Sequence, residues 1–138
     1  MAGYSGTPLA QKLGIKSGHM CALLYAPANF SDLIGELPPD VKTVQSLAGK
    51  QLFDVIVFFT HSEAKLVEKF EILRDRLTVA GGLWISWPKK ASKVATDLNE
   101  NRIRDIGLGL GLVDNKVCAV DETYSGLRFV RRLKDRPK

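Results

Sequence analysis

The stretch FDVIVFFTHSEAKLVEKFEILRDRLTVAGGLWISW, residues 53–87, decides the fold class of this chain. Its first segment, residues 53–60, is apolar at nearly every position, which is typical of a strand buried on both faces of a parallel sheet. Residues 83–87 show the same character after a helical pattern. The stretch therefore predicts a strand–helix–strand unit inside an α/β protein.

The helix of this unit is expected from Glu63 to Val79, with Ser62 as its N-terminal cap and Gly81-Gly82 as its end. Charged residues fill one side of the helix. The other side is an apolar stripe at helical spacing, formed by Leu66, Phe70, Leu73 and Leu77.

Further elements are expected on both sides of this unit. Short helices are predicted over residues 6–14, with Thr7 as cap, and over residues 29–37. A third helix begins near residue 99. The remaining strands are predicted over residues 19–26, 41–47, 115–121 and 126–133, and the last two of them form a hairpin.

Strands that alternate with helices imply a mainly parallel sheet with helices on both faces. We predict the spatial strand order second, first, third, fourth, sixth, fifth, with the sixth strand antiparallel. The fold class is a single-domain, Rossmann-like α/β fold of reduced size over residues 1–138. Residues 1–14 form an N-terminal arm with a short helix, and residues 133–138 form a basic tail.

The composition is that of a soluble globular protein of 138 residues with a formal net charge of +5. No apolar run approaches the roughly 20 residues that cross a bilayer, and the N-terminus has no apolar signal region. We therefore expect a cytoplasmic protein without a membrane partner. Cys21 and Cys118 do not have the spacing of a metal or redox motif, so buried free thiols are expected.

Two local sequences resemble class I S-adenosylmethionine-dependent methyltransferases. GIKSGHMCALLYAPAN, residues 14–29, is similar to the lead-in and first strand of that family. LRDRLTVAGGLWIS, residues 73–86, is similar to its helix, Gly-Gly turn and fifth strand. The resemblance implies the same sheet with a C-terminal hairpin.

The chain departs from that family where the cofactor would bind. The resemblance implies a glycine-rich turn after the first strand, but Tyr25 and Pro27 stand there instead. It also implies an acid at the end of the second strand for the ribose hydroxyls, and VQSLAG, residues 44–49, contains none. We therefore expect the cofactor site to be absent or rebuilt, and we predict no cofactor.

The chain as a whole also resembles a small bacterial family of unknown function. GYSGTPLAQKLGIK near the start, WPKKASKVATDL in the middle and GLVDNKVCAVDETYSGL near the end carry this likeness. It implies the same α/β fold and brings no activity with it.

Ligands of open parallel sheets bind beyond the carboxyl ends of the strands. In the predicted topology, residues 25–29, 60–62, 89–97 and 121–126 share that edge. The candidate ligand-binding residues there are Lys89, Lys90, Ser92, Thr96, Asp97, Asp121, Thr123, Tyr124 and His61. No catalytic or metal-binding set is expected, and His19 is set aside because it lies at the opposite end of the sheet.

Two interpretations of these residues stay open. In the first, the two lysines attract an anion, while Ser92 and Thr96 donate hydroxyl hydrogen bonds. In the second, Asp97 caps a helix with Glu100 at its third position, and the lysines are solvated or pair with Asp121 and Glu122.

Two further motifs have structural interpretations. Gly107–Gly111 looks like a dinucleotide-binding glycine loop, but it follows a helix and precedes a strand. A helix end packed closely against the sheet is therefore expected. Trp84 and Trp87 are three positions apart in a strand, so they should lie on opposite faces of the sheet.

The function favoured by the sequence is a non-catalytic protein that binds a small anion or phosphate, or another protein, through a degenerate methyltransferase-like fold. A small enzyme that acts on a phosphorylated metabolite, or a divergent methyltransferase, is one alternative. A nucleic-acid accessory protein that uses the basic tail is another. The sequence does not indicate the oligomeric state.

Overall fold

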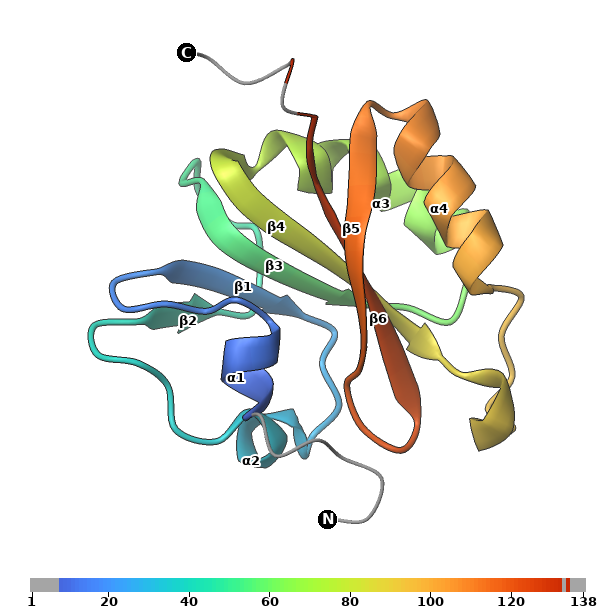
Figure 1. The fold of residues 1–138 in the computed structure, drawn as a ribbon, viewed down its shortest axis with the longest axis horizontal. Helices are drawn as coiled ribbons and strands as arrows, with labels where there is room; N and C mark the ends of the chain where they lie inside the picture. The colour runs from blue at the N-terminus through green and yellow to red at the C-terminus, as the bar shows by residue number, and fades with distance from the viewer. Residues whose placement is uncertain (1–7, 133, 135–138) are drawn as a thin grey trace.

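The computed structural model describes residues 8–132 and residue 134, and these form a six-stranded sheet with helices on both faces (Figure 1). The strand order is β2-β1-β3-β4-β6-β5. Strands β1 to β4 pair in parallel, whereas β6 is antiparallel to both β4 and β5. The predicted strand order and the single antiparallel strand are confirmed.

The elements follow one another in the predicted alternation. The strands are β1 (Met20–Leu24), β2 (Lys42–Val44), β3 (Phe53–Phe59), β4 (Leu77–Pro88), β5 (Leu112–Ala119) and β6 (Tyr124–Arg131). The helices are α1 (Leu9–Lys12), α2 (Phe30–Ile34), α3 (Glu63–Asp75), the short 3-10 helix η1 (Lys90–Ser92) and α4 (Glu100–Gly109). The predicted cap of α1, Thr7, lies outside the described residues.

Two apolar layers fill the space between the sheet and its helices. Under α3 and α4, Leu66, Phe70 and Ile103 pack against the strands. Under α1 and α2, the packing includes Leu13 and Phe30. Residues 55–59 of β3 contribute to both layers, as their unbroken apolar character predicted.

The two tryptophans of β4 lie on opposite faces of the sheet, as predicted. Trp87 belongs to the layer under α3 and α4, and Trp84 belongs to the layer under α1 and α2. Burying Trp84 completely requires a partner for its indole N–H. Nε1 of Trp84 donates to the carbonyl oxygen of Leu13 at 2.9 Å, which ties the N-terminal segment to the centre of the sheet.

The predicted extent of α3 was wrong at its C-terminal end. The helix stops at Asp75, and Leu77 already pairs with Phe53 as the first residue of β4. Gly81 and Gly82 lie within β4 and do not end the helix. A side chain at Gly81 would meet the carbonyl oxygen of Phe53 at 2.9 Å, so the glycine allows the bulge between β3 and β4.

The connection from β2 to β3 contains no helix, and residues 45–52 cross the height of the sheet. Extended chain covers about 3.3 Å per residue, so this length suffices. The guanidinium of Arg76 holds the connection in place, because it donates to the carbonyl oxygens of Leu47 at 2.7 Å and of Gln51 at 2.8 Å.

The glycine-rich segment at residues 107–111 is the end of α4, as expected, and is not a nucleotide loop. A side chain at Gly107 would lie 2.1 Å from the ring of Phe129. That ring is completely buried and makes an edge-to-face contact with Phe70, so it has little room to move. Gly107 thus sets how closely α4 approaches the sheet.

We predict that Gly107→Ala lowers the free energy of unfolding by about 1–3 kcal/mol, because overpacking a full core forces side chains from their positions. Gly109→Ala is the matched control, because nothing lies within 4 Å of a side chain there. Alanine favours helix over glycine by up to about 1 kcal/mol, so this control should be neutral or stabilising. Urea unfolding measures both, and equal effects would contradict this account of the packing.

Candidate functional site

The carboxyl ends of the strands bring the predicted segments together. The amide of Lys89, directly after β4, donates to the carbonyl oxygen of Thr123 in the β5–β6 loop at 2.8 Å. His61, after β3, contacts Tyr124, the first residue of β6 after that loop. The predicted convergence of segments far apart in sequence is therefore present.

The two predicted hydroxyl donors are engaged with neighbouring backbone. Oγ of Ser92 donates to the carbonyl oxygen of Lys89 at 2.7 Å and accepts from the amide of Val94. Oγ1 of Thr96 donates to the carbonyl oxygen of His61 at 2.6 Å and accepts from the amide of Leu98. Both hydroxyls therefore stabilise the backbone conformation of residues 89–98.

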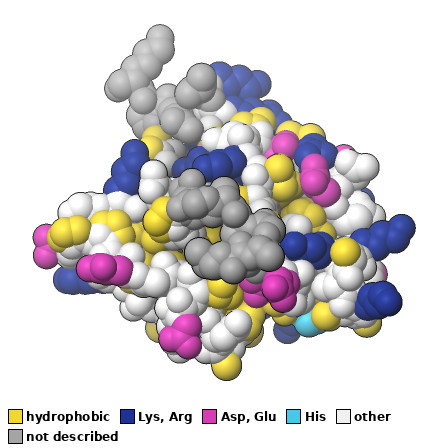
Figure 2. Space-filling model, turned by 60° about the horizontal axis from the view of Figure 1, so that its bottom comes forward, with side chains coloured by type: hydrophobic (Ala, Val, Ile, Leu, Met, Phe, Trp, Pro, Cys, Tyr) yellow, Lys and Arg dark blue, Asp and Glu magenta, His cyan; other side chains and the backbone are white. Residues whose placement is uncertain are grey.

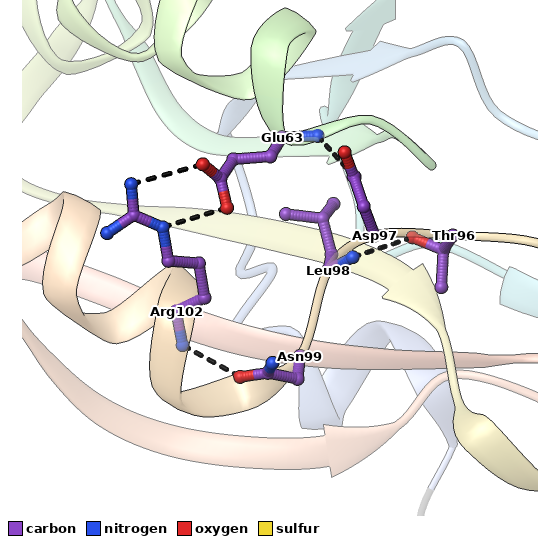
Figure 3. A network of polar contacts seen from close by, with 6 residues as sticks. All are labelled: Glu63, Thr96, Asp97, Leu98, Asn99 and Arg102. Carbon is purple, nitrogen blue, oxygen red and sulfur yellow. Dashed lines mark hydrogen bonds and ion pairs between the residues drawn. The ribbon is translucent and has the colours of Figure 1, made fainter.

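Asp97 does not cap the helix that was expected to begin there. Helix α4 is capped by Asn99, whose Oδ1 accepts from the amide of Arg102 at 2.9 Å, so the predicted pairing of Asp97 with Glu100 was wrong (Figure 3). Asp97 instead accepts from the amide of Glu63, the first residue of α3, at 2.7 Å. A carboxylate at a helix N-terminus is stabilising there.

An ion pair joins the same two helix ends. The guanidinium of Arg102 binds both carboxylate oxygens of Glu63, at 2.8 and 3.1 Å (Figure 3). Asp97 and Ser62 already accept from the amides of Glu63 and Lys65. The N-terminal turn of α3 therefore has two of its donors engaged inside the protein.

Asp121 shapes the β5–β6 loop. Its Oδ1 accepts from the amides of Thr123 at 2.8 Å and of Tyr124 at 2.7 Å. A carboxylate that receives two backbone donors in this way fixes a tight turn. Glu122 is exposed beside it.

His61 and Tyr124 form the polar pair of the edge. Nε2 of His61 lies 2.9 Å from the hydroxyl of Tyr124, and the Tyr124 ring packs edge-to-face on Phe59. Burial raises the pKa of Tyr124, and the nearby carboxylate of Asp121 raises it further. The phenol therefore stays protonated and can donate or accept a hydrogen bond.

A cavity of about 240 Å³ opens beside this pair, and we call it the carboxyl-edge cavity. It is lined by Tyr25, Phe59, Thr60, His61, Lys65 and Tyr124. Lys89 and Lys90 are not among these lining residues. Lys89 is half-buried, and Lys90 is exposed at the start of η1. An anion site formed by this lysine pair stays a prediction.

Tyr25 has a backbone conformation that sequence reasoning missed. Its φ is 58°, in the left-handed region that bulky residues rarely adopt. The side chain is 66% exposed and touches Phe58 edge-to-face. The backbone thus keeps a turn that usually needs glycine, although the residue there is a tyrosine.

Tyr25 separates the carboxyl-edge cavity from a second one of about 470 Å³ at the ends of β1 and β2. This second cavity is lined by Leu23, Tyr25, Ala26, Pro27, Ala28, Phe30, Ser31 and Gln45. It contains no acid that could hold ribose hydroxyls. Pro27 also removes one backbone donor from the turn.

Ser86 is a second residue that the sequence did not single out. Its hydroxyl is the buried side-chain polar atom for which the described part of the chain provides no hydrogen-bond partner. It lies in β4 between Phe59 of β3 and Gly126 of β6. Only its unusual polarity within LWISW could have marked it.

The described residues contain no group of three or more His, Cys, Asp or Glu side chains that could hold a metal ion. None of their helices is both long and apolar enough to cross a membrane. Cys21 is a buried free thiol, and burial raises its pKa to about 11. Cys118 is also free and is half-buried.

The comparisons with solved structures identify the fold. No family model and no curated protein matches the chain, so the likeness to a small bacterial family stays a prediction. A DhpI–SAH complex superposes with a TM-score of 0.61 and 12% identity over 95% of this chain and 83% of that chain.

Two further solved structures are similar to the chain over most of its length. Magnesium protoporphyrin IX methyltransferase from Synechocystis PCC 6803 with bound SAM gives a TM-score of 0.57 at 11% identity, over 90% of this chain and 74% of that one. A TehB-like SAM-dependent methyltransferase from Corynebacterium glutamicum gives 0.57 at 11% identity, over 95% and 91%. The chain has the class I methyltransferase-like fold, and the predicted remote resemblance is confirmed.

We predict that Asp121→Ala lowers the free energy of unfolding by about 1–2 kcal/mol, because two partly buried amides lose their acceptor. Asp121→Asn keeps an acceptor oxygen and should lose less than half as much. Urea unfolding compares the two variants. If the charge of Asp121 mattered because it neutralises Lys89 and Lys90, the two variants would lose stability equally.

Proposed function

We propose that this chain is a non-catalytic methyltransferase-like protein that binds a small anion in the carboxyl-edge cavity. The observation that supports this most strongly is Tyr25 at the turn after β1. The resemblance to methyltransferases implies a glycine-rich, cofactor-binding turn there, whereas Tyr25 occupies it with a left-handed φ of 58°. A left-handed conformation costs a residue other than glycine roughly 1–2 kcal/mol, so this backbone conformation of Tyr25 lowers the stability of the fold.

The size of the carboxyl-edge cavity favours a ligand smaller than a nucleoside cofactor. Sites for drug-sized ligands usually occupy about 300–1,000 Å³, whereas a cavity of about 150 Å³ accommodates benzene. At about 240 Å³, this cavity suits a ligand with a single ring or an equivalent apolar part. Tyr25 and Phe59 provide its apolar walls.

The polar groups of the cavity favour a negative charge on that ligand. Lys65 supplies a positive charge from the first turn of α3. The His61–Tyr124 pair supplies one further hydrogen-bond donor beside it, because the other donor is used between the two side chains. No acidic residue lines the cavity. A small aromatic carboxylate matches this combination of one cation, a phenol and aromatic walls.

A divergent methyltransferase is the second candidate, and the cavity of about 470 Å³ supports it. That cavity lies at the ends of β1 and β2 and is large enough for a nucleoside. Two of the similar structures, the DhpI–SAH complex and the Synechocystis enzyme with bound SAM, contain SAH or SAM. The lack of an acid in the cavity and the missing donor at Pro27 weigh against this candidate.

A nucleic-acid accessory role has less support among the described residues. Figure 2 turns the bottom of Figure 1 toward the viewer, and basic and acidic side chains are interspersed on the face it shows. Arg131 donates to the carbonyl oxygens of Arg74 and Leu77, so it is engaged within the protein. Residues 133 and 135–138 of the basic tail lie outside the described residues.

We predict that 4-hydroxybenzoate raises the melting temperature of the protein and that Lys65→Met abolishes this effect. A ligand at a hundredfold excess over its Kd adds about 2.7 kcal/mol of stability, which raises Tm by several degrees in a domain of this size. Thermal unfolding at constant ionic strength measures the shift. Lys50→Met removes one exposed lysine elsewhere and should leave the shift unchanged.

The same measurement separates the candidates. A shift with S-adenosylmethionine and none with the carboxylate would favour the divergent methyltransferase. A carboxylate shift of the same size in Lys65→Met would exclude the proposed cavity as the binding site.

A further inference from the structure

A second polar cavity lies at the opposite end of the sheet, where the parallel strands begin, and we call it the amino-edge cavity. Its volume is about 360 Å³. It is lined by Lys12, Gly14, Lys16, His19, Asp54, Thr78, Ala80, Lys116 and Arg128. These residues come from several segments of the chain, so nothing in the sequence marks them as a group.

Four cationic side chains face one carboxylate in this cavity. Lys12 and Lys16 come from α1 and the segment that follows it, and Lys116 and Arg128 come from neighbouring positions on β5 and β6. Burial raises the pKa of Cys118, while Lys12 and Lys116 act on it in the opposite direction, so both lysines lie close to that thiol. A concave surface lined by one sign of charge concentrates ions of the other sign.

The single acid of the cavity is already occupied. Oδ2 of Asp54 accepts from the amide of Met20 at 2.9 Å, and Oδ1 lies 3.4 Å from the hydroxyl of Thr78. Asp54 thus holds the beginning of β1 against β3. The three lysines of the cavity outnumber this one carboxylate.

The geometry of two residues also suits an anion. Nδ1 of His19 accepts from the amide of Lys16 at 3.1 Å, so the ring hydrogen of the neutral side chain resides on Nε2, which can donate. Arg128 lies against Gly82, where a side chain would come within 2.4 Å of its Nε. Because Gly82 has no side chain, the guanidinium of Arg128 has room to pack against this face of the sheet.

We propose that the amino-edge cavity binds the phosphate group of a small phosphomonoester. A planar arginine guanidinium and several flexible lysine ammonium groups can bind several oxygens at once. A phosphate group, with two negative charges and three free oxygens, matches them better than a carboxylate with one charge. The cavity is concave and falls at the lower end of the size range of small-molecule sites, so it fits a compact ligand and not a duplex. This inference does not rest on the carboxyl-edge proposal.

The test compares two double variants that remove the same charge, one inside the amino-edge cavity and one outside both cavities. Lys16→Met/Lys116→Met changes two exposed lysines of the amino-edge cavity. Lys50→Met/Lys69→Met is the matched control, because neither lysine lines the amino-edge cavity or the carboxyl-edge cavity. Thermal unfolding is measured with inorganic phosphate and with glycerol 3-phosphate, and sodium chloride keeps the ionic strength constant.

We expect both phosphate compounds to raise Tm of the wild-type protein beyond the effect of sodium chloride. The apparent affinity should fall at least tenfold in Lys16→Met/Lys116→Met and should be unchanged in Lys50→Met/Lys69→Met. Amide-resolved NMR of the wild-type protein provides a readout that does not depend on the variants folding. Phosphate should shift the amide signals of residues 14–19.

Several results would overturn the proposal. One is a loss of affinity in the control variant that matches the loss in the test variant. A second is a set of phosphate-induced NMR shifts confined to residues 60–65 or 89–97. A third is a short single-stranded oligonucleotide that binds in place of the phosphomonoester, because that would identify backbone phosphodiesters as the ligand.

Discussion

The parallel pairing of β3 with β4 is the constraint on which the rest of the structure depends. From Val55 paired with Gly82 to Phe59 paired with Ser86, two strands are covered on both faces. Apolar side chains on both faces require helices on both sides, and α3 and α4 cover one while α1 and α2 cover the other. Polar residues can then converge only where strands begin or end, so both proposed sites lie at the ends of the strands.

Much of the fold was predictable because its signals are local or depend on simple pairing rules. Residues 53–60 revealed a central strand, and the strand–helix alternation gave the correct strand order. The end of α3 was missed because Leu77 fits the helical stripe as well as it fits a strand. Only its pairing with Phe53 decides between the two, and periodicity does not contain that long-range contact.

The candidate site was predictable in location but not in detail. The segments at the carboxyl edge do converge, yet Thr96 and Asp97 bind backbone atoms of other segments, and Asp121 binds amides of its own loop. The sequence shows which polar side chains are present, but it does not show which backbone groups bind them in the folded protein. The amino-edge cavity was missed for a related reason, since Lys116 is far in sequence from Lys12 and Lys16, and the fold brings them together.

The chain has a methyltransferase-like fold in which Tyr25 occupies the first turn with a left-handed backbone. The most direct test of this turn is an amide-resolved NMR titration of the wild-type protein with S-adenosylmethionine. We predict no saturable shifts for the amides of Tyr25, Ala26 and residues 28–30 at millimolar cofactor. Saturable shifts of these signals at micromolar concentration would show that the turn still accepts the cofactor, and would contradict this prediction.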